Sequence, residues 1–337
     1  MNRGRLLSFK SDMKKITRRP HFIFSLLFTF YLLSGNGFAA EKVLDASQIG
    51  KAPVLLSQYF DVLEDASLKL SLADVQKTDI ASRFKTDTPA TDALGFGYTP
   101  SAFWLRLALS NKSDQPIERL LEINYARLSS VQFHQPDTGG AYKSLMTGNL
   151  YPSATRPYKN RNFVFPVTLP AHSVQVYYLR FESVASIIIP ARLWESQAFH
   201  TYERDDYVSQ AWYFGIATAM VLFNLLLFVA LRDFIYLMYV SFVGFMSLSL
   251  ASQNGLAKEF IWPNLTVWSD MSTSVGYGIS FVTLLIFMRR MLNTSRFIPG
   301  LDRINKIFIG THLIFLIGYV VSLTTFLKTS ALLFFVT

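Results

Sequence analysis

Two residues able to bind a ligand stand two positions apart in an alternating stretch of the chain. Residues 103–109 alternate between large apolar residues and a second set that includes Trp104 and Arg106. On a strand this spacing puts the indole and the guanidinium on one face, about 7 Å apart. Such a pair can stack on a sugar and hydrogen-bond an anionic group. Trp104 and Arg106 are therefore candidate ligand residues, with Tyr98 and Tyr125 as weaker companions. The alternative is that a loop or helix covers this face and Trp104 is core.

The sequence offers no recognisable catalytic apparatus. It has no Gly-x-Ser-x-Gly, no phosphate-binding glycine loop and no His-Glu-x-x-His. The histidines His134, His172 and His200 are isolated from one another, and the chain has no cysteine. Metal ligation needs several ligands at defined spacing. We therefore expect no enzymatic activity, no metal and no cofactor.

Three polar residues lie within long apolar stretches: Asn224, Asn254 and His312. A polar or ionisable side chain at membrane depth is a functional candidate by default. The alternative is a hydrogen bond to a neighbouring helix or, for His312, an extended side chain that reaches the interface. Because no acidic residue lies within any predicted span, a proton- or ion-coupled transporter is disfavoured.

The elements that hold the candidate ligand residues are predicted to be strands. The alternation of residues 103–109 recurs in residues 121–125 and 163–169, and Asn, Asp, Gly and Pro clusters separate these runs. Short strands with one apolar face each favour an all-β, jelly-roll-like sandwich of two antiparallel sheets. We assign it residues 40–206, with a short helix near residues 71–75.

The C-terminal half is predicted to be an α-helical transmembrane bundle, residues 207–337. Charged residues there are so widely spaced that the stretches between them reach the roughly 20 residues that cross a bilayer. Four complete spans are predicted at about 208–231, 234–256, 271–288 and 307–327. A fifth begins at Thr329 and is cut short at Thr337, so we expect a fragmentary gene model or a disrupted gene.

The formal net charge of +9 does not indicate a nucleic-acid partner, because most of it lies in residues 1–39. This basic segment, with an apolar run and then small residues, is typical of a secretory signal peptide cleaved after Ala39. An uncleaved anchor helix is the alternative, and Met13 is a second plausible start. If the sandwich is outside, six loop basic residues lie in the cytoplasm against two outside, as the positive-inside rule requires. We therefore expect a multi-pass inner-membrane protein of a Gram-negative bacterium with its N-terminal domain in the periplasm.

Several motifs resemble a known receptor family. Residues 59–65 and 70–75, the run Gly95–Arg106 and the segment Arg161–Pro166 are similar to the type 2 extracellular domain of the bacterial seven-transmembrane receptors with diverse intracellular signalling modules. In the membrane region, residues 213–216 with Asn224, residues 231–239, and Asn254-Gly255-Leu256 with residues 262–264 resemble that family's first two helices and outer loop.

The resemblance implies a membrane-bound signal-transduction receptor. In such a receptor, a periplasmic sandwich would sense a small ligand, for which a carbohydrate-like molecule is one candidate. A helical bundle would relay the state to a cytoplasmic output module such as a histidine kinase or diguanylate cyclase. No such module is present in this sequence. A homo-oligomer or a partner signalling protein is compatible with this role. The alternative is a membrane-anchored carbohydrate-binding or envelope protein with no signalling output.

Overall fold

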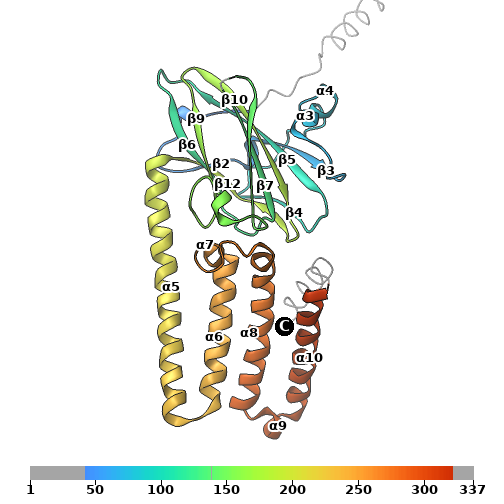
Figure 1. The fold of residues 1–337 in the computed structure, drawn as a ribbon, viewed down its shortest axis with the longest axis vertical. Helices are drawn as coiled ribbons and strands as arrows, with labels where there is room; N and C mark the ends of the chain where they lie inside the picture. Colours follow the sequence, from blue (N-terminus) through green and yellow to red (C-terminus); the bar gives the residue numbers. More distant parts are fainter. Residues whose placement is uncertain (1–41, 138, 322–337) are drawn as a thin grey trace, which may run out of the picture. The chain divides into compact units, whose positions relative to one another are not determined.

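The computed structural model describes residues 42–137 and 139–321, apart from the side chains of the last two residues. Its first part is a β-rich domain and its second part is helical (Figure 1). The predicted signal peptide and the predicted fifth span lie outside the described residues, and the fourth span is described only in part.

Two sheets form the body of the β-rich domain. One has the strand order β1-β5-β10-β7-β8, with β3 also paired to β5; the other has the order β2-β12-β6-β9. A separate two-stranded sheet pairs β11 with β4. The bounds are β1 Val43–Asp45, β2 Val54–Leu55, β3 Phe60–Asp65, β4 Leu94–Gly97, β5 Ala102–Asn111, β6 Ile117–Ile123, β7 Ser130–Pro136, β8 Tyr142–Thr147, β9 Phe163–Leu169, β10 Ser173–Glu182, β11 Ile187–Ile189 and β12 Ala191–Glu195.

The core lies between the two larger sheets, as the alternation predicts. The apolar face of β5, from Phe103 to Leu109, is buried in one cluster with that of β9, from Phe163 to Leu169. Phe133 of β7 and Phe165 of β9 stack across the sheets with ring centroids 4.6 Å apart. The predicted sandwich is therefore confirmed. The jelly-roll connectivity stays a prediction.

The second face of β5, which the sequence leaves open to either a ligand or a cover, is buried as well. β5 is an inner strand, with β10 along one edge and both β1 and β3 along the other. The short helices α3 (Leu72–Val75) and α4 (Thr78–Ala81) belong to the segment that covers this face, and Val75 and Phe84 pack in one cluster with Trp104. Ser71 caps α3 through a reciprocal capping box with Asp74, which fixes where this cover begins.

The helical part follows the last strand without a linker. The Glu195 carboxylate accepts hydrogen bonds from the backbone N–H groups of Gln197 and Ala198, so α5 (Ser196–Leu231) begins at once. The helix therefore begins within residues 40–206, the segment predicted to be the sandwich. Its first turns still belong to the β-rich domain, since Phe199 packs against Leu120 and Val164 of the sheet. The other helices are α6 Phe234–Gln253, α7 Leu256–Phe260, α8 Thr266–Met291, α9 Thr294–Phe297 and α10 Pro299–Val321.

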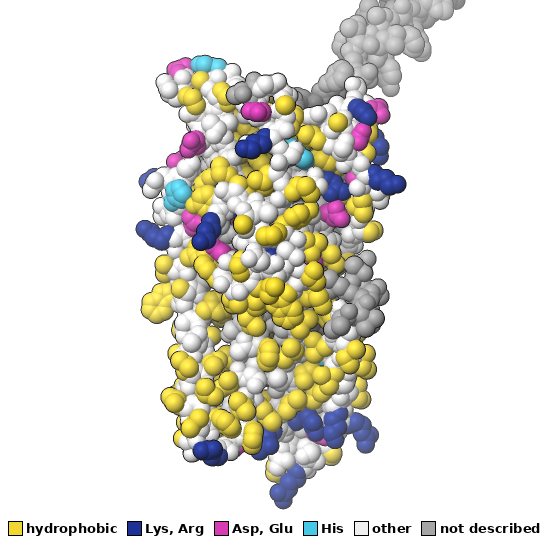
Figure 2. All heavy atoms as spheres, in the orientation of Figure 1, with side chains coloured by type: hydrophobic (Ala, Val, Ile, Leu, Met, Phe, Trp, Pro, Cys, Tyr) yellow, Lys and Arg dark blue, Asp and Glu magenta, His cyan; other side chains and the backbone are white. Residues whose placement is uncertain are grey.

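Within residues 42–137 and 139–321, three helices are long and apolar enough to cross a membrane: α5, α6 and α8. Hydrophobic side chains cover the visible face of the helical part, and Lys and Arg side chains gather at one end of it (Figure 2). Arg232 after α5, Arg289 and Arg290 in the last turn of α8, and Arg296 in α9 belong to the loops on this side. This distribution agrees with the predicted orientation.

The burial of Trp104 generates a stability prediction. Trp104 is 1% exposed, so Trp104→Ala leaves a large cavity and should destabilise the domain by about 3–5 kcal/mol. Val174 on β10 is 62% exposed, so Val174→Ala should change stability by less than about 0.5 kcal/mol. Thermal melting of both variants in the full chain measures the difference. Equal melting temperatures would contradict the core assignment.

Candidate functional site

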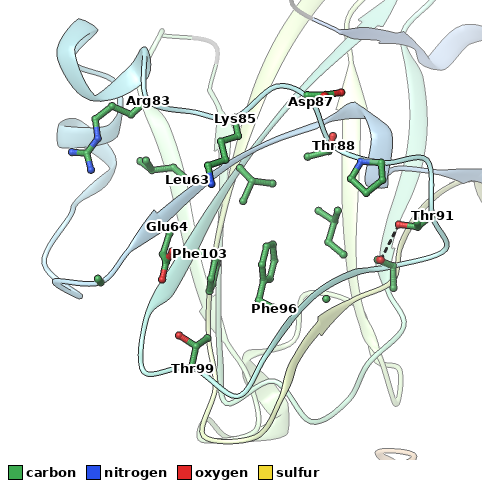
Figure 3. A pocket seen from close by; sticks show the side chains of 16 residues that line it. Leu63, Glu64, Arg83, Lys85, Asp87, Thr88, Thr91, Phe96, Thr99 and Phe103 are labelled. Carbon is green, nitrogen blue, oxygen red and sulfur yellow. Dashed lines mark hydrogen bonds between the residues drawn. The ribbon is translucent and has the colours of Figure 1, made fainter.

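A cavity of about 1000 Å³ lies at the edge of the β-rich domain, beside β3, β4 and the start of β5. The segment from Arg83 to Ala93 forms its remaining wall (Figure 3). This segment is attached to β3 by a two-residue bridge, in which the backbone N–H and C=O groups of Val62 and Lys85 exchange hydrogen bonds of 2.9 and 2.8 Å. The bridge brings Lys85 beside the strand that carries Glu64.

The base of the cavity is apolar. Val62, Leu94, Phe96 and Phe103 line it, and the rings of Phe96 and Phe103 stack with centroids 3.9 Å apart. Leu94 and Phe103 also belong to the sandwich core. The base is therefore fixed by the same packing that holds the two sheets together.

Four charged side chains line the cavity, and all of them are exposed: Glu64, Arg83, Lys85 and Asp87. Figure 3 shows the Lys85 side chain extending inward on the side where Glu64 and Phe103 lie, while Arg83 extends away. The Glu64 carboxylate is oriented by a hydrogen bond of 2.7 Å donated by the Ser101 hydroxyl. Within the part of the chain that the structure describes, neither Lys85 nor Glu64 forms an ion pair. Both charges are thus available to a ligand.

The predicted ligand residues lie elsewhere, and none of them lines this cavity. Trp104 is buried under the α3–α4 segment, which is the covered alternative left open by the sequence. Arg106 makes two hydrogen bonds to the Asp61 carboxylate, of 3.0 and 2.7 Å, and lies over the Phe84 ring. Tyr98 is 44% exposed, whereas Tyr125 packs against the core. The structure does not bring these four residues together around one space.

Trp104 has a buried polar neighbourhood. Its ring stacks on His134 at 5.5 Å, and Arg180 lies opposite it on β10. The His134 Nδ1 atom is 2.7 Å from the Ser144 hydroxyl. Burial, and then the positive charge of Arg180, lower the pKa of His134 to about 4. His134 is therefore a neutral, structural side chain at pH 7.

The intramembrane polar residues differ in their surroundings. Asn224 donates a 2.9 Å hydrogen bond to the Met220 carbonyl within α5. His312 of α10 is 2% exposed, has Nδ1 2.9 Å from the Phe308 carbonyl and stacks on Phe281 of α8. Asn254 is the C-cap residue of α6, and its carbonyl accepts a hydrogen bond from Arg161 of the β-rich domain. Among the described residues, no group of three or more His, Cys, Asp or Glu could hold a metal ion.

Arg161 joins the β-rich domain to the first two membrane helices. From the loop before β9 its Nε and Nη2 atoms donate to the Asp206 carboxylate on α5, at 2.7 and 2.9 Å. Its Nη1 atom donates to the Asn254 carbonyl at the end of α6, at 3.0 Å. Arg161 is 8% exposed, so one buried guanidinium holds three elements together.

The backbone of Arg161 is held as well. Its N–H donates to the Tyr207 hydroxyl at 2.9 Å, and that hydroxyl donates to the Glu259 carboxylate of α7 at 2.6 Å. Gly255 has φ +81°, and a Cβ at this position would collide with the Arg161 carbonyl oxygen and with Ala126. A glycine is therefore needed here for both backbone conformation and space. We call these contacts of Arg161 the Arg161 junction.

A second buried junction lies at the start of α8. The Asp270 carboxylate accepts a 3.1 Å hydrogen bond from the Asn149 side chain, and the Lys258 ammonium donates to the Asn149 carbonyl at 3.2 Å. Lys258 is 2% and Asp270 5% exposed. Burial and the nearby charge of Arg156 lower the pKa of Lys258 to about 8, while Asp270 raises it. Asn149, in the loop after β8, is thus held between two buried charges of the helical part.

Comparison with known protein families accounts for both parts of the chain. Residues 57–195 match the model for 7TMR-DISM extracellular 2, and residues 206–337 match the model for 7TM diverse intracellular signalling. The chain belongs to the 7TMR-DISM family. It is a membrane protein of receptor type, with an extracellular domain followed by a transmembrane region. No match was found among curated proteins.

The family motifs seen in the sequence meet at the Arg161 junction. Arg161 opens one of these motifs, and Asn254 and Gly255 open another, yet nothing local indicates that they touch. Lys258 and Asp270 are recognisable in the sequence only as the charges that border predicted spans. No sequence signal indicates that Lys85 lies near Glu64, because their proximity depends on the bridge between Val62 and Lys85.

The Arg161 junction predicts how well the loop after α6 is protected from amide hydrogen exchange. Arg161→Met removes the partner of the half-buried Asp206 carboxylate and the hydrogen bond to the Asn254 carbonyl, so amide hydrogen exchange in residues 254–261 should accelerate about tenfold or more. Arg204→Met, which removes an exposed cation from α5, should leave that exchange unchanged. Exchange followed by mass spectrometry on the full chain in lipid nanodiscs provides the measurement. Identical protection in both variants would refute the assigned role of Arg161.

The lowered pKa of His134 predicts how the stability of the domain depends on pH. With its folded pKa near 4 and an unfolded value near 6.5, the unfolded state binds more protons between these values. Stability should therefore fall as the pH drops through this window, by on the order of 2 kcal/mol. His134→Gln should remove that part of the pH dependence, and His200→Gln should not. The test is the melting temperature as a function of pH; identical profiles for wild type and His134→Gln would exclude this contribution.

Proposed function

We propose that this chain is the sensing and transmitting part of a receptor in the inner membrane of a Gram-negative bacterium. The extracellular domain would lie in the periplasm and bind a small ligand. A change in that domain would reach α5 and α6 through the Arg161 junction, and α8 through Asn149. In this role the residues that the structure describes perform no catalytic step, and the response is produced by a cytoplasmic signalling module.

The observation that carries the proposal is the Arg161 junction. A passive anchor needs only one hydrophobic helix, whereas here the buried guanidinium of Arg161 contacts the first span and the end of the second span. The backbone N–H of Arg161 is linked through the Tyr207 hydroxyl to Glu259, in the loop between the second and third spans. A ligand shifts the equilibrium between two conformations of a receptor only if it binds them with different affinities. The ligand site must therefore be coupled to the part of the receptor that changes conformation. The ion pair between buried Arg161 and half-buried Asp206 supports such coupling, because separating the two groups leaves the buried guanidinium without its charge partner.

The ligand class is a separate question. We assign the ligand of the receptor to the cavity beside β3 and β4. A carbohydrate-like ligand is suggested by the family resemblance alone. Ligand cavities of about 300–1000 Å³ suit small molecules. Trp104 is not available as a stacking surface unless the α3–α4 segment moves, so a sugar would have to use the edges of Phe96 and Phe103.

The proposed orientation predicts the labelling of introduced thiols. The chain has no cysteine, so Lys159→Cys and Arg296→Cys each provide a single reactive group. In cells with a permeabilised outer membrane, a membrane-impermeant thiol reagent should label the cysteine at 159 and not the one at 296. The reverse pattern would overturn the orientation.

Transmission predicts a change at the cytoplasmic side when the outer junction is broken. In the full chain in nanodiscs, adding Arg161→Met to the Arg296→Cys variant should alter the labelling rate at 296 by about fivefold or more. Arg204→Met is the matched control and should have no effect. An unchanged rate in a folded Arg161→Met variant would favour the alternative function, an anchored binding protein without signalling.

A further inference from the structure

The cavity beside β3 and β4 presents one positive and one negative group on the same side of a strand pair. Val62 and Glu64 are two residues apart on β3, so their side chains share a face, and Lys85 lies opposite Val62 in the bridge. Lys85 and Glu64 are therefore diagonal neighbours, with Cα atoms about 7–8 Å apart. They do not pair with each other. The gap between them suits a ligand that carries both complementary charges.

The space between the Lys85 and Glu64 side chains suits a ligand whose own two charges lie close together. A charge-assisted hydrogen bond is about 2.8 Å long, so a ligand carboxylate on Lys85 and a ligand ammonium on Glu64 would bridge several ångströms between the two side chains. The Glu64 carboxylate keeps one oxygen free, because the Ser101 hydroxyl occupies only Oε1. Figure 3 shows Arg83 extending away from this gap. Arg83 therefore does not supply a second cation within it.

The other groups of the cavity favour an apolar ligand body over a polyhydroxylated one. The Thr88 hydroxyl donates to the Phe60 carbonyl at 2.8 Å, and the Thr91 hydroxyl donates to the Ala93 carbonyl at 3.0 Å. The hydroxyl hydrogens of Thr88 and Thr91 are therefore already used and are not available to a sugar. Phe96 and Phe103 stack on each other, which uses one face of each ring. Their remaining surface, with Val62 and Leu94, suits an aliphatic or aromatic side chain.

We propose that this cavity binds a zwitterionic ligand, a free amino acid or short peptide with an apolar side chain, through Lys85 and Glu64. The proposal rests on the proposed receptor function and specifies its ligand class. The carboxylate of the ligand pairs with Lys85, its ammonium pairs with Glu64, and its apolar side chain lies on the base formed by Val62, Leu94, Phe96 and Phe103. The volume of about 1000 Å³ leaves room for two or three residues.

The test uses the full chain in lipid nanodiscs and isothermal titration calorimetry. The probes are L-phenylalanine and L-leucyl-L-leucine, with 2-phenylethylamine, which lacks the carboxylate, 3-phenylpropionate, which lacks the ammonium, and D-glucose. The zwitterions should bind at millimolar concentration or below, and each single-charge analogue should bind about tenfold or more weakly. D-glucose should not bind in this cavity.

The variants assign each charge to its partner. Lys85→Met should weaken L-phenylalanine binding about tenfold or more. The Lys85→Met variant should then bind L-phenylalanine and 2-phenylethylamine with equal affinity. Glu64→Gln keeps an acceptor for the Ser101 hydroxyl. This variant should bind L-phenylalanine and 3-phenylpropionate with equal affinity. Lys51→Met and Glu118→Gln, which change exposed charges that do not line the cavity, should bind like wild type.

Three results would overturn the proposal: no binding of either zwitterion, zwitterion affinities unchanged in Lys85→Met and Glu64→Gln, or D-glucose binding that depends on Lys85. None of these results affects the labelling experiment at position 296, which uses no ligand. A failure of this ligand assignment is therefore distinguishable from a failure of the receptor function.

Discussion

The ion pair between Arg161 and Asp206 is the interaction on which the relation between the extracellular domain and the membrane helices depends. A guanidinium that is 8% exposed is tolerated only when its donors are satisfied, and here Nε, Nη1 and Nη2 all have acceptors. Removing one partner from such a pair generally costs about 3–5 kcal/mol. The pair therefore acts as a fixed point, and motion of the loop before β9 has to move α5 and the end of α6 with it.

The helix that begins directly after β12 reinforces this constraint. Because Glu195 caps α5 at its first residues, the last strand and the first membrane helix are joined without a flexible segment. Asn149 adds a second attachment, at the start of α8, between two buried charges. Two polar contacts and one continuous helix thus link the sandwich to three membrane helices. This arrangement suits transmission better than simple anchoring.

The sandwich itself is closed on the face where the sequence suggests a ligand. The α3–α4 segment covers Trp104, and the Asp61 carboxylate occupies Arg106, so the polar face of β5 is internal structure. The open space lies at the edge of the same sheet, where the segment from Arg83 to Ala93 returns along β3. Its base is the rim of the core, which gives a ligand site a rigid floor. Its walls carry the charges that would recognise the ligand.

Short-range patterns in the sequence determined the two architectures. The alternation of residues 103–109 and 163–169 identified the core face of the sandwich, because side-chain direction in a strand follows from neighbouring residues alone. The spacing of charges after Tyr207 identified the membrane helices, because a bilayer tolerates few charges over its thickness. Separate motifs, in order along the chain, identified the family.

Only the tertiary structure decided which segment covers the second face of β5 and which polar residues contact one another. The cover of Trp104, the proximity of Lys85 to Glu64 and the contacts of Arg161 with Asp206 and Asn254 all depend on segments far apart in the chain. Arg161 lies 45 residues from Asp206 and 93 from Asn254, and no local period encodes such a distance. The physical reason is that burial and ion pairing depend on position in space, whereas propensity and hydrophobic pattern depend on position along the chain.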